Sequence, residues 1–232
     1  MKVEIWSDVV CPWCFIGKRR FEQAVAGFGH SVEVVYRSFE LDPSAPVGGD
    51  ETVTASLARK YGGEARVAQL QEHVAHLAEE VGLHLRLGET LHTNTVDAHR
   101  LLHLALERGG PTVQHTVQEA LFAAYFEDVR DVSDHAVLRE VAIGAGLDGS
   151  EVDDVLAGAR YRDAVEADIE RARAYGAGGV PFFVLEEAYA VSGAQPTDTF
   201  AQVLQQVWQA TQPDLVTLGG TDADVCGPEG HD

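Results

Sequence analysis

The chain has 232 residues, 45% of them hydrophobic, which suffices for one large domain or for one domain with a sizeable insertion. Lys and Arg number 17 against 37 Asp and Glu, giving a formal net charge of −20. Phosphate backbones and anionic membrane surfaces would repel such a chain, so we expect neither nucleic acid nor membrane as a partner.

The N-terminus also bears on the compartment. It lacks a charged segment followed by an apolar core and a cleavage site, and no run approaches the length of a membrane span. We therefore expect a cytoplasmic protein, in which thiols are kept reduced. In that compartment a pair of cysteines separated by two residues is more often catalytic than structural.

The first elements predict a βαβ unit. An apolar strand at residues 3–6 precedes the motif Cys11-Pro12-Trp13-Cys14, a helical pattern follows directly, and residues 31–39 read as a second strand. Residues 42–50 are rich in Asp, Pro, Ser and Gly and interrupt the pattern, so a boundary is expected there. The first part of the domain thus covers residues 1–50.

The cysteine motif has the setting of a redox dithiol. A strand delivers Cys11 to a helix N-terminus, where free N–H groups and the positive end of the dipole favour a thiolate. Pro12 suits the first helical position. Cys14 follows one turn later, so its sulfur can reach that of Cys11.

A zinc site is the main alternative for this motif. Two cysteines at this spacing need two further ligands, and Cys226 with His231 has a fitting separation. The great sequence distance between the two pairs and the strand–turn–helix setting favour the dithiol. The histidine pairs His99/His103 and His73/His76 lie at helical spacing, but such residues are more often surface or core residues, so we expect no metal.

Residues 51–176 predict a helical insertion. The segments are rich in Ala, Leu, Glu and Arg and are separated by glycine-containing breaks at 62–63, 82, 109–111, 144–149 and 158. The segment 112–126 carries apolar residues at four-residue spacing, which indicates a helix that packs in the core.

The pattern of residues 177–215 predicts two strands and a helix, which would form the second part of the domain that begins at residues 1–50. Pro181 cannot donate to a sheet ladder, so it marks the start of the apolar strand 182–185, a strand edge or a special turn. A second short strand at 189–193 completes a hairpin, and a capped amphipathic helix follows from residue 197 to 210. Residues 216–232 are expected to form a flexible tail.

These pieces resemble the DsbA-type thioredoxin-fold oxidoreductases, and most closely their FrnE-like branch. The motifs that carry the resemblance are SDVVCPWC at 7–14, NT at 94–95 with AHR at 98–100, LFAAYF at 121–126, GVPFF at 179–183 and SGAQP at 192–196. The resemblance covers nearly the whole chain and implies an α/β thioredoxin fold with a large all-helical insertion. It also implies a cis bond between Val180 and Pro181 that lies against the dithiol.

The expected function is thiol–disulfide exchange with protein or small thiol and disulfide substrates, with Cys11 as nucleophile and Cys14 as resolving thiol. Pro12, Trp13, Val180 and Pro181 would contact the substrate, which pairs with the Val180 backbone as an added strand. No cofactor is expected beyond the dithiol itself, although glutathione could serve as co-substrate. Nothing in the sequence indicates an oligomeric state.

Three further residues are candidates for accessory roles. His99 and Asn94 belong to the signature that, by resemblance, faces the dithiol, and His99 could adjust thiolate stability. Cys226 resembles the remnant of a second, C-terminal cysteine pair of the FrnE-like branch, which leaves it a single thiol or part of an exposed tail.

A second class of function stays open. Thioredoxin-fold proteins of the kappa glutathione transferase and 2-hydroxychromene-2-carboxylate isomerase type share the insertion and the Val-Pro pair. They bind glutathione, act on small aromatic substrates and usually carry serine at the position of Cys11. The cysteine pair favours dithiol exchange over this glutathione-dependent isomerase or transferase activity.

Overall fold

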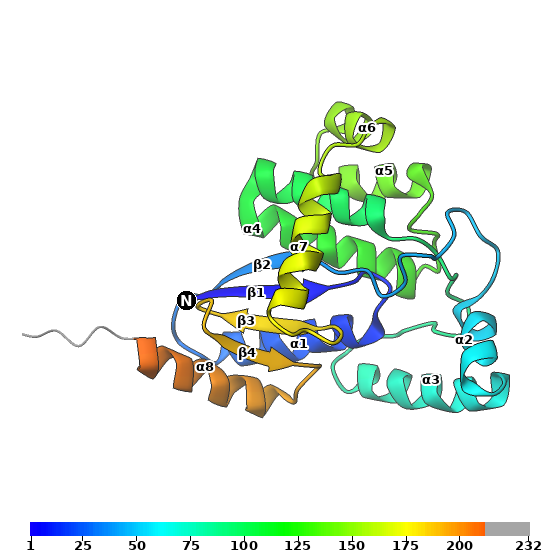
Figure 1. Ribbon diagram of the computed structural model, residues 1–232. Helices are drawn as coiled ribbons and strands as arrows, with labels where there is room; N and C mark the ends of the chain where they lie inside the picture. Colours follow the sequence, from blue (N-terminus) through cyan, green and yellow to red (C-terminus); the bar gives the residue numbers. More distant parts are fainter. Residues whose placement is uncertain (212–232) are drawn as a thin grey trace, which may run out of the picture.

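The computed structural model describes residues 1–211 and is built around a four-stranded mixed sheet (Figure 1). The strand order is β2–β1–β3–β4, and the strands span Glu33–Ser38, Lys2–Ser7, Phe182–Leu185 and Tyr189–Ser192. β1 pairs in parallel with β2, and antiparallel with β3, which pairs antiparallel with β4. The expected α/β thioredoxin fold with a large all-helical insertion is confirmed.

Helices cover both faces of this sheet, with α1 (Pro12–Ala26) and α8 (Thr197–Thr211) on one side. Alternate residues of a strand point to opposite faces, so Ile5 and its register partner Phe183 face these two helices. Phe183 lies 5.3 Å from Phe21 of α1 and 4.7 Å from Phe200 of α8, measured between ring centroids. The aromatic cluster fixes both helices on the sheet.

The insertion between β2 and β3 contains six helices (Figure 1). They are α2 (Val53–Tyr61), α3 (Glu64–Glu79), α4 (Val96–Phe126), α5 (His135–Gly144), α6 (Gly149–Ala157) and α7 (Arg162–Ala174). The predicted break at residues 109–111 is confirmed as a kink, because Gly110 leaves the helical conformation at φ 64° and ψ −165°. Beyond it, buried Val117, Leu121 and Phe122 confirm the predicted core-facing stripe.

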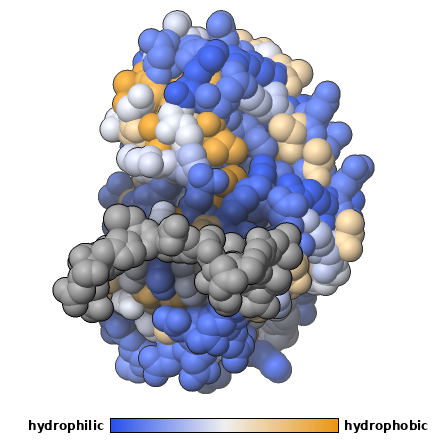
Figure 2. Space-filling view, turned by 90° about the vertical axis from the view of Figure 1, so that its left-hand side faces the viewer, coloured by the Kyte–Doolittle hydropathy of each residue, from blue (hydrophilic) through white to orange (hydrophobic). Residues whose placement is uncertain are grey.

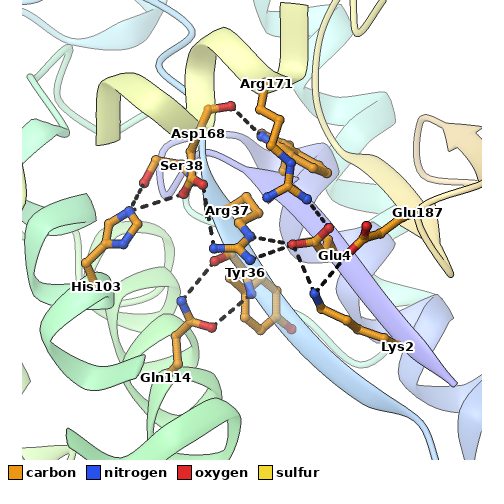
Figure 3. Close-up of polar contacts among 11 residues, drawn as sticks. Lys2, Glu4, Tyr36, Arg37, Ser38, His103, Gln114, Asp168, Arg171 and Glu187 are labelled. Carbon is orange, nitrogen blue, oxygen red and sulfur yellow. Dashed lines mark hydrogen bonds and ion pairs between the residues drawn. The ribbon is translucent and has the colours of Figure 1, made fainter. Parts of the chain in front are cut away.

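A buried ionic network holds α7 against the opposite face of the sheet (Figure 3). Glu4 of β1 is almost fully buried and pairs with Arg37 of β2 at 2.5 Å and with Arg171 of α7. Asp168, one turn earlier on α7, accepts a hydrogen bond from the Ser38 backbone N–H at 3.0 Å. A buried charge is tolerated only when it is paired, and here the pairing joins β1, β2 and α7.

Gln114 of α4 closes part of the outer edge of the sheet (Figure 3). Its side-chain amide accepts from the Tyr36 N–H and donates to the Tyr36 carbonyl, both at 2.9 Å. These backbone groups of edge strand β2 would otherwise be unpaired. The long insertion helix α4 therefore covers the sheet and also supplies hydrogen-bond partners to its edge strand β2.

The face shown in Figure 2 is predominantly hydrophilic, with hydrophobic residues in smaller groups. Within residues 1–211, none of the helices combines the length and the apolar character that a membrane span requires. The predicted boundaries at residues 50, 176 and 215 stay predictions, and the tail 216–232 lies outside the described residues.

Candidate active site

The β1–α1 loop places Cys11 at the N-cap of α1. The Cys11 N–H donates to the Asp8 carbonyl, and the Cys11 carbonyl accepts from the Cys14 N–H, both at 3.0 Å. Pro12 occupies the first turn of the helix, and no side chain caps its free N–H groups. A helix N-terminus stabilises anions, and the thiolate is the nucleophilic form of cysteine.

Cys14 differs from Cys11 in its surroundings. Both thiols are free and buried, and the Cys14 side chain lies inside the first turn of α1. Burial raises the pKa of Cys14 well above its usual value, and the neighbouring Cys11 raises it further, against the opposing effects of an Asp8 backbone hydrogen bond and the Ser7 hydroxyl. Cys14 is therefore held as a thiol.

The Val180–Pro181 bond is cis and lies against the dithiol, as the family resemblance implied. The Cys11 thiol lies 3.7 Å from the Val180 carbonyl oxygen and donates to it. These residues are 169 positions apart in the sequence, and the pairing of β1 with β3 brings them together.

Trp13 and Pro12 border a cavity of about 420 Å³. Its walls come from α2, α3 and the loops that flank them, and they are mainly apolar: Val53, Leu57, Tyr61, Val67, Leu70, Val74 and Leu87. Trp13 also packs against the large hydrophobic core of the insertion. Trp13, the third residue of the Cys11–Cys14 motif, thus borders a cavity between the dithiol and the insertion.

Asp8 and His99 form a buried pair at the base of the same loop. Asp8 Oδ1 lies 3.4 Å from His99 Nε2, and both side chains are only 1% exposed. The other carboxylate oxygen, Oδ2, accepts a hydrogen bond from the Leu41 N–H at 2.8 Å. Asp8 therefore connects the β1–α1 loop with α4 and with the segment after β2.

The other accessory candidates lie elsewhere. The Asn94 side chain accepts from the Val96 N–H at 3.0 Å and donates to the Ala45 carbonyl at 3.4 Å, so it organises the start of α4. Cys226 lies outside the described residues.

Comparison with known proteins identifies the family. A model of the DSBA-like thioredoxin domain matches residues 2–205. The chain belongs to this family. It is similar to the crystal structure of a probable DsbA oxidoreductase from Streptomyces coelicolor, with 46% identity, a TM-score of 0.86 and coverage of 99% of this chain and 97% of that one.

This DSBA-like thioredoxin domain is also similar to one further sequence relative and to one further solved structure. The chain is 28% identical over 204 residues to the uncharacterized protein YwbO of Bacillus subtilis, covering 87% of this chain and 94% of the relative. It also shares its fold with a 2-hydroxychromene-2-carboxylate isomerase, at 13% identity and a TM-score of 0.68, covering 90% and 97% of the two chains.

The histidines of this DSBA-like domain make contacts other than metal ligation in the described part of the chain. His103 lies 3.1 Å from Asp168 and 3.2 Å from the Ser38 hydroxyl, whereas His73 and His76 are exposed on α3. No group of three or more His, Cys, Asp or Glu side chains within residues 1–211 is arranged to hold a metal ion. The alternative ligands Cys226 and His231 lie outside those residues.

Two features of the site were not recognised in the sequence. Asp8 stands in the motif of residues 7–14, yet nothing local indicates that its carboxylate meets a histidine 91 positions later. Gly17 follows the dithiol on α1, and a β-carbon there would lie only 3.0 Å from Cγ of Pro181. A glycine inside a strongly predicted helix is the signal that could have indicated a close approach.

Proposed function

We propose that this protein is a thiol–disulfide oxidoreductase that exchanges disulfides with polypeptide substrates through Cys11 and Cys14. The observation that carries the proposal is the position of the Cys11 sulfur at a helix N-terminus, 3.7 Å from the Val180 carbonyl. This arrangement combines a nucleophile with backbone groups that a substrate chain could pair with.

The chemistry is a two-step exchange. The Cys11 thiolate attacks one sulfur of a substrate disulfide, which forms a mixed disulfide and releases the other substrate sulfur as a thiolate. Cys14 then loses its proton and attacks the Cys11 sulfur, which releases the second substrate thiolate and forms the Cys11–Cys14 disulfide. The substrate gains two electrons, and the enzyme loses them.

The same steps run in reverse when the enzyme starts oxidised. A substrate thiolate then attacks the Cys11 sulfur, and a second substrate thiol resolves the mixed disulfide. A cytoplasmic glutathione pool would return the dithiol to its starting state in either direction. The reduction potential of the Cys11/Cys14 pair decides which direction dominates.

The difference between the two cysteines supports the assignment of roles. Because burial raises the pKa of Cys14, that residue is a poor nucleophile toward external disulfides and reacts once a mixed disulfide lies beside it. The Val180 carbonyl would accept a hydrogen bond from a substrate N–H, and Pro12 with Trp13 would contact the substrate's side chains.

The buried pair of Asp8 and His99 is proposed as an accessory to this chemistry. Its charge state would influence the thiolates through the loop that carries both Asp8 and Cys11, because electrostatic interactions are strong in buried surroundings. His99→Gln would test this role by the pH dependence of Cys11 alkylation, which a purely packing role would leave unchanged.

The central test uses two serine variants in an insulin-reduction assay. Cys11→Ser should abolish turnover, whereas Cys14→Ser should accumulate a mixed disulfide that appears on a non-reducing gel. Cys226→Ser is the matched control and should retain turnover if exchange needs only the pair at 11 and 14. Retained turnover in Cys11→Ser would refute the proposal.

The second candidate is a glutathione-dependent isomerase or transferase for small aromatic compounds. The shared fold with a 2-hydroxychromene-2-carboxylate isomerase and the apolar cavity beside Trp13 favour it. Such an activity would need added glutathione and would persist in Cys14→Ser. Assays of aromatic isomerisation with both serine variants would therefore separate the two functions.

A further inference from the structure

Ser7 carries a buried hydroxyl that contributes nothing to the stability of the fold. It is the last residue of β1 and is only 2% exposed. Within residues 1–211, its Oγ is closed to solvent and has no hydrogen-bond partner. Burial of a hydroxyl without a partner costs free energy, and alanine would fill the same place without that cost. A serine at this position therefore needs an explanation other than stability.

The neighbouring strand provides a contrast. Ser38 is the register partner of Ser7 at the end of β2 and is similarly buried, at 3% exposure. Its hydroxyl lies 3.2 Å from His103 Nε2 and so has a hydrogen-bond partner. A buried serine at this end of the two strands can thus be satisfied, whereas Ser7 is not.

Strand alternation directs the Ser7 side chain toward α1. Ile5 packs in one core cluster with Phe21 of α1, and residues two positions apart on a strand face the same side of the sheet. Ser7 follows Ile5 by two positions, so it faces α1 as well. Only three residues separate Ser7 from Cys11, and the Cys11 N–H donates to the Asp8 carbonyl at 3.0 Å. The short loop keeps the first turn of α1 beside the end of β1.

Cys14 lies on the side of α1 that faces the sheet. It precedes Phe21 by seven residues, which is about two helical turns, so the two side chains share one face of the helix. Cys14 is 2% exposed. The Ser7 hydroxyl and the Cys14 thiol are therefore buried together, between the last residue of β1 and the first turn of α1.

Two hydrogen-bond donors act on the Cys14 sulfur. Burial and the neighbouring Cys11 raise the pKa of Cys14, whereas the Asp8 backbone N–H and the Ser7 hydroxyl oppose them. A donor lowers the pKa of a thiol by interacting with its charged form. While Cys14 is a free thiol, Ser7 Oγ is unpartnered, so this donor is already in place before the charge develops. A donor held in advance stabilises a developing charge without a cost of reorganisation.

We propose that the Ser7 hydroxyl is a catalytic hydrogen-bond donor that stabilises the Cys14 thiolate in the second step of disulfide exchange. In that step the Cys14 proton passes through water to the departing substrate sulfur. The Cys14 sulfur bonds to the Cys11 sulfur, and the bond between Cys11 and the substrate breaks. The enzyme dithiol is oxidised, the substrate sulfur is reduced, and Ser7 keeps its own proton. The proposal rests on the proposed exchange function and assigns a residue to its resolving step.

The test follows both steps of a single turnover in a Cys226→Ser background, in which Cys11 and Cys14 are the only cysteines. An equimolar peptide carries one cysteine activated as a mixed disulfide with thionitrobenzoate. Release of the coloured thiolate reports attack by Cys11 on the peptide sulfur. Mass spectrometry of acid-quenched samples follows the decay of the enzyme–peptide disulfide, which reports attack by Cys14.

Ser7→Ala should leave colour release unchanged and slow the decay of the enzyme–peptide disulfide about three- to tenfold at pH 7. Loss of a hydrogen bond to a charged group lowers the thiolate fraction about tenfold or more. The remaining thiolate is more basic and therefore more nucleophilic, which offsets about half of that loss on a logarithmic scale.

The pair Ser7→Thr and Ser7→Val separates the hydroxyl from side-chain packing. Threonine and valine have nearly the same shape, and only threonine carries a hydroxyl. Both variants introduce the same extra methyl group, so any effect of packing is common to them. The threonine variant should resolve the enzyme–peptide disulfide about threefold or more faster than the valine variant.

Ser38→Ala is the matched control, since it removes a buried hydroxyl that has a partner from the same end of the adjacent strand. It should lower the thermal stability and keep wild-type rates for both steps. Ser7→Ala should instead keep or raise the thermal stability, because it removes an unpartnered hydroxyl. A purely structural role for Ser7 would predict the opposite change in stability.

Wild-type decay of the enzyme–peptide disulfide in Ser7→Ala would overturn the proposal. Equal decay in the threonine and valine variants would also overturn it, because the effect would then come from packing. Equal slowing of both steps in Ser7→Ala would place the effect at Cys11 and refute the assignment to Cys14. A wild-type protein that forms no mixed disulfide at Cys11 would refute the proposed exchange function, and the role of Ser7 with it.

Discussion

Gly17 of α1 packs directly against Pro181, because a β-carbon on Gly17 would lie 3.0 Å from Cγ of Pro181 and 3.3 Å from Cβ of Ala194. A side chain at residue 17 would therefore require the helix that begins with the dithiol and the Val180–Pro181 segment to move apart by a few tenths of an ångström. Such a shift would act on the same segment that holds the Val180 carbonyl 3.7 Å from the Cys11 sulfur.

Gly17→Ala should slow disulfide exchange by displacing the Pro181 segment from Cys11. Overpacking costs about 1–3 kcal/mol, which exceeds the gain of up to about 1 kcal/mol from alanine's higher helix propensity, so stability should fall or stay level. Insulin reduction and thermal unfolding measure the two effects. Gly144→Ala is the control, because no atoms lie within 4 Å of a β-carbon there, and it should be neutral or stabilising.

Resolution of the mixed disulfide should accelerate as pH rises. Burial is the largest cause of the raised pKa of Cys14 and persists when Cys11 is bound to a substrate, so the reactive thiolate fraction grows with pH throughout the neutral range. Acid-quenched samples on non-reducing gels measure the lifetime of the intermediate. A lifetime independent of pH between 6 and 9 would contradict the assignment of Cys14.

Gln114→Leu should destabilise the protein by about 1–3 kcal/mol for each backbone group of Tyr36 that it leaves buried and unpaired. Gln118 offers a matched control one turn later on α4, because it is equally buried but its side-chain amide has no partner. Gln118→Leu should be neutral or stabilising. Urea unfolding of both variants measures the difference, and equal losses would refute the edge-closing role of Gln114.

Acid should remove a stabilising contact between α1 and α4. Burial tends to raise the pKa of Glu119, but hydrogen bonds from Arg19 and Lys18 outweigh it and hold that pKa below its usual value. A lowered pKa gives stability that is present above the unfolded-state value, about 4.3, and is lost as pH falls through the folded-state value.

Glu119→Gln should therefore be less stable than wild type at pH 7, and the difference should shrink as pH falls below about 4. Thermal unfolding from pH 3 to pH 7 follows this change. Glu140→Gln serves as the control, since Glu140 pairs with Arg130 at the surface, where such pairs contribute little.

The sequence predicted the elements that depend on local patterns. β1, the start of α1 and the strand after Pro181 follow from apolar alternation and proline placement, and the kink at Gly110 follows from the Gly-Gly-Pro run. The cis bond was expected only through family resemblance.

The remaining features arise from contacts between distant segments. The pairing of Asp8 with His99 and the packing of Gly17 on Pro181 need the tertiary fold, since nothing in the spacing of these residues relates them. The cavity beside Trp13 likewise depends on where α2 and α3 lie. Local patterns therefore located the nucleophile but not the tertiary contacts around it.

The place where the insertion enters and leaves the sheet bears on whether a smaller protein could be designed from this chain. β2 and β3 both flank β1, so the ends of the insertion at Ser38 and Phe182 are separated by about 10 Å, a gap that a few residues could bridge. Connectivity thus permits deletion. Side-chain packing opposes deletion of the insertion, because the ring of Phe15, the residue after the dithiol, stacks on the ring of Phe122 of α4 with 4.7 Å between the ring centroids. A smaller protein without the insertion helices would expose the Phe15 ring to solvent and would lack the packing that holds the start of α1, and with it the dithiol, in place.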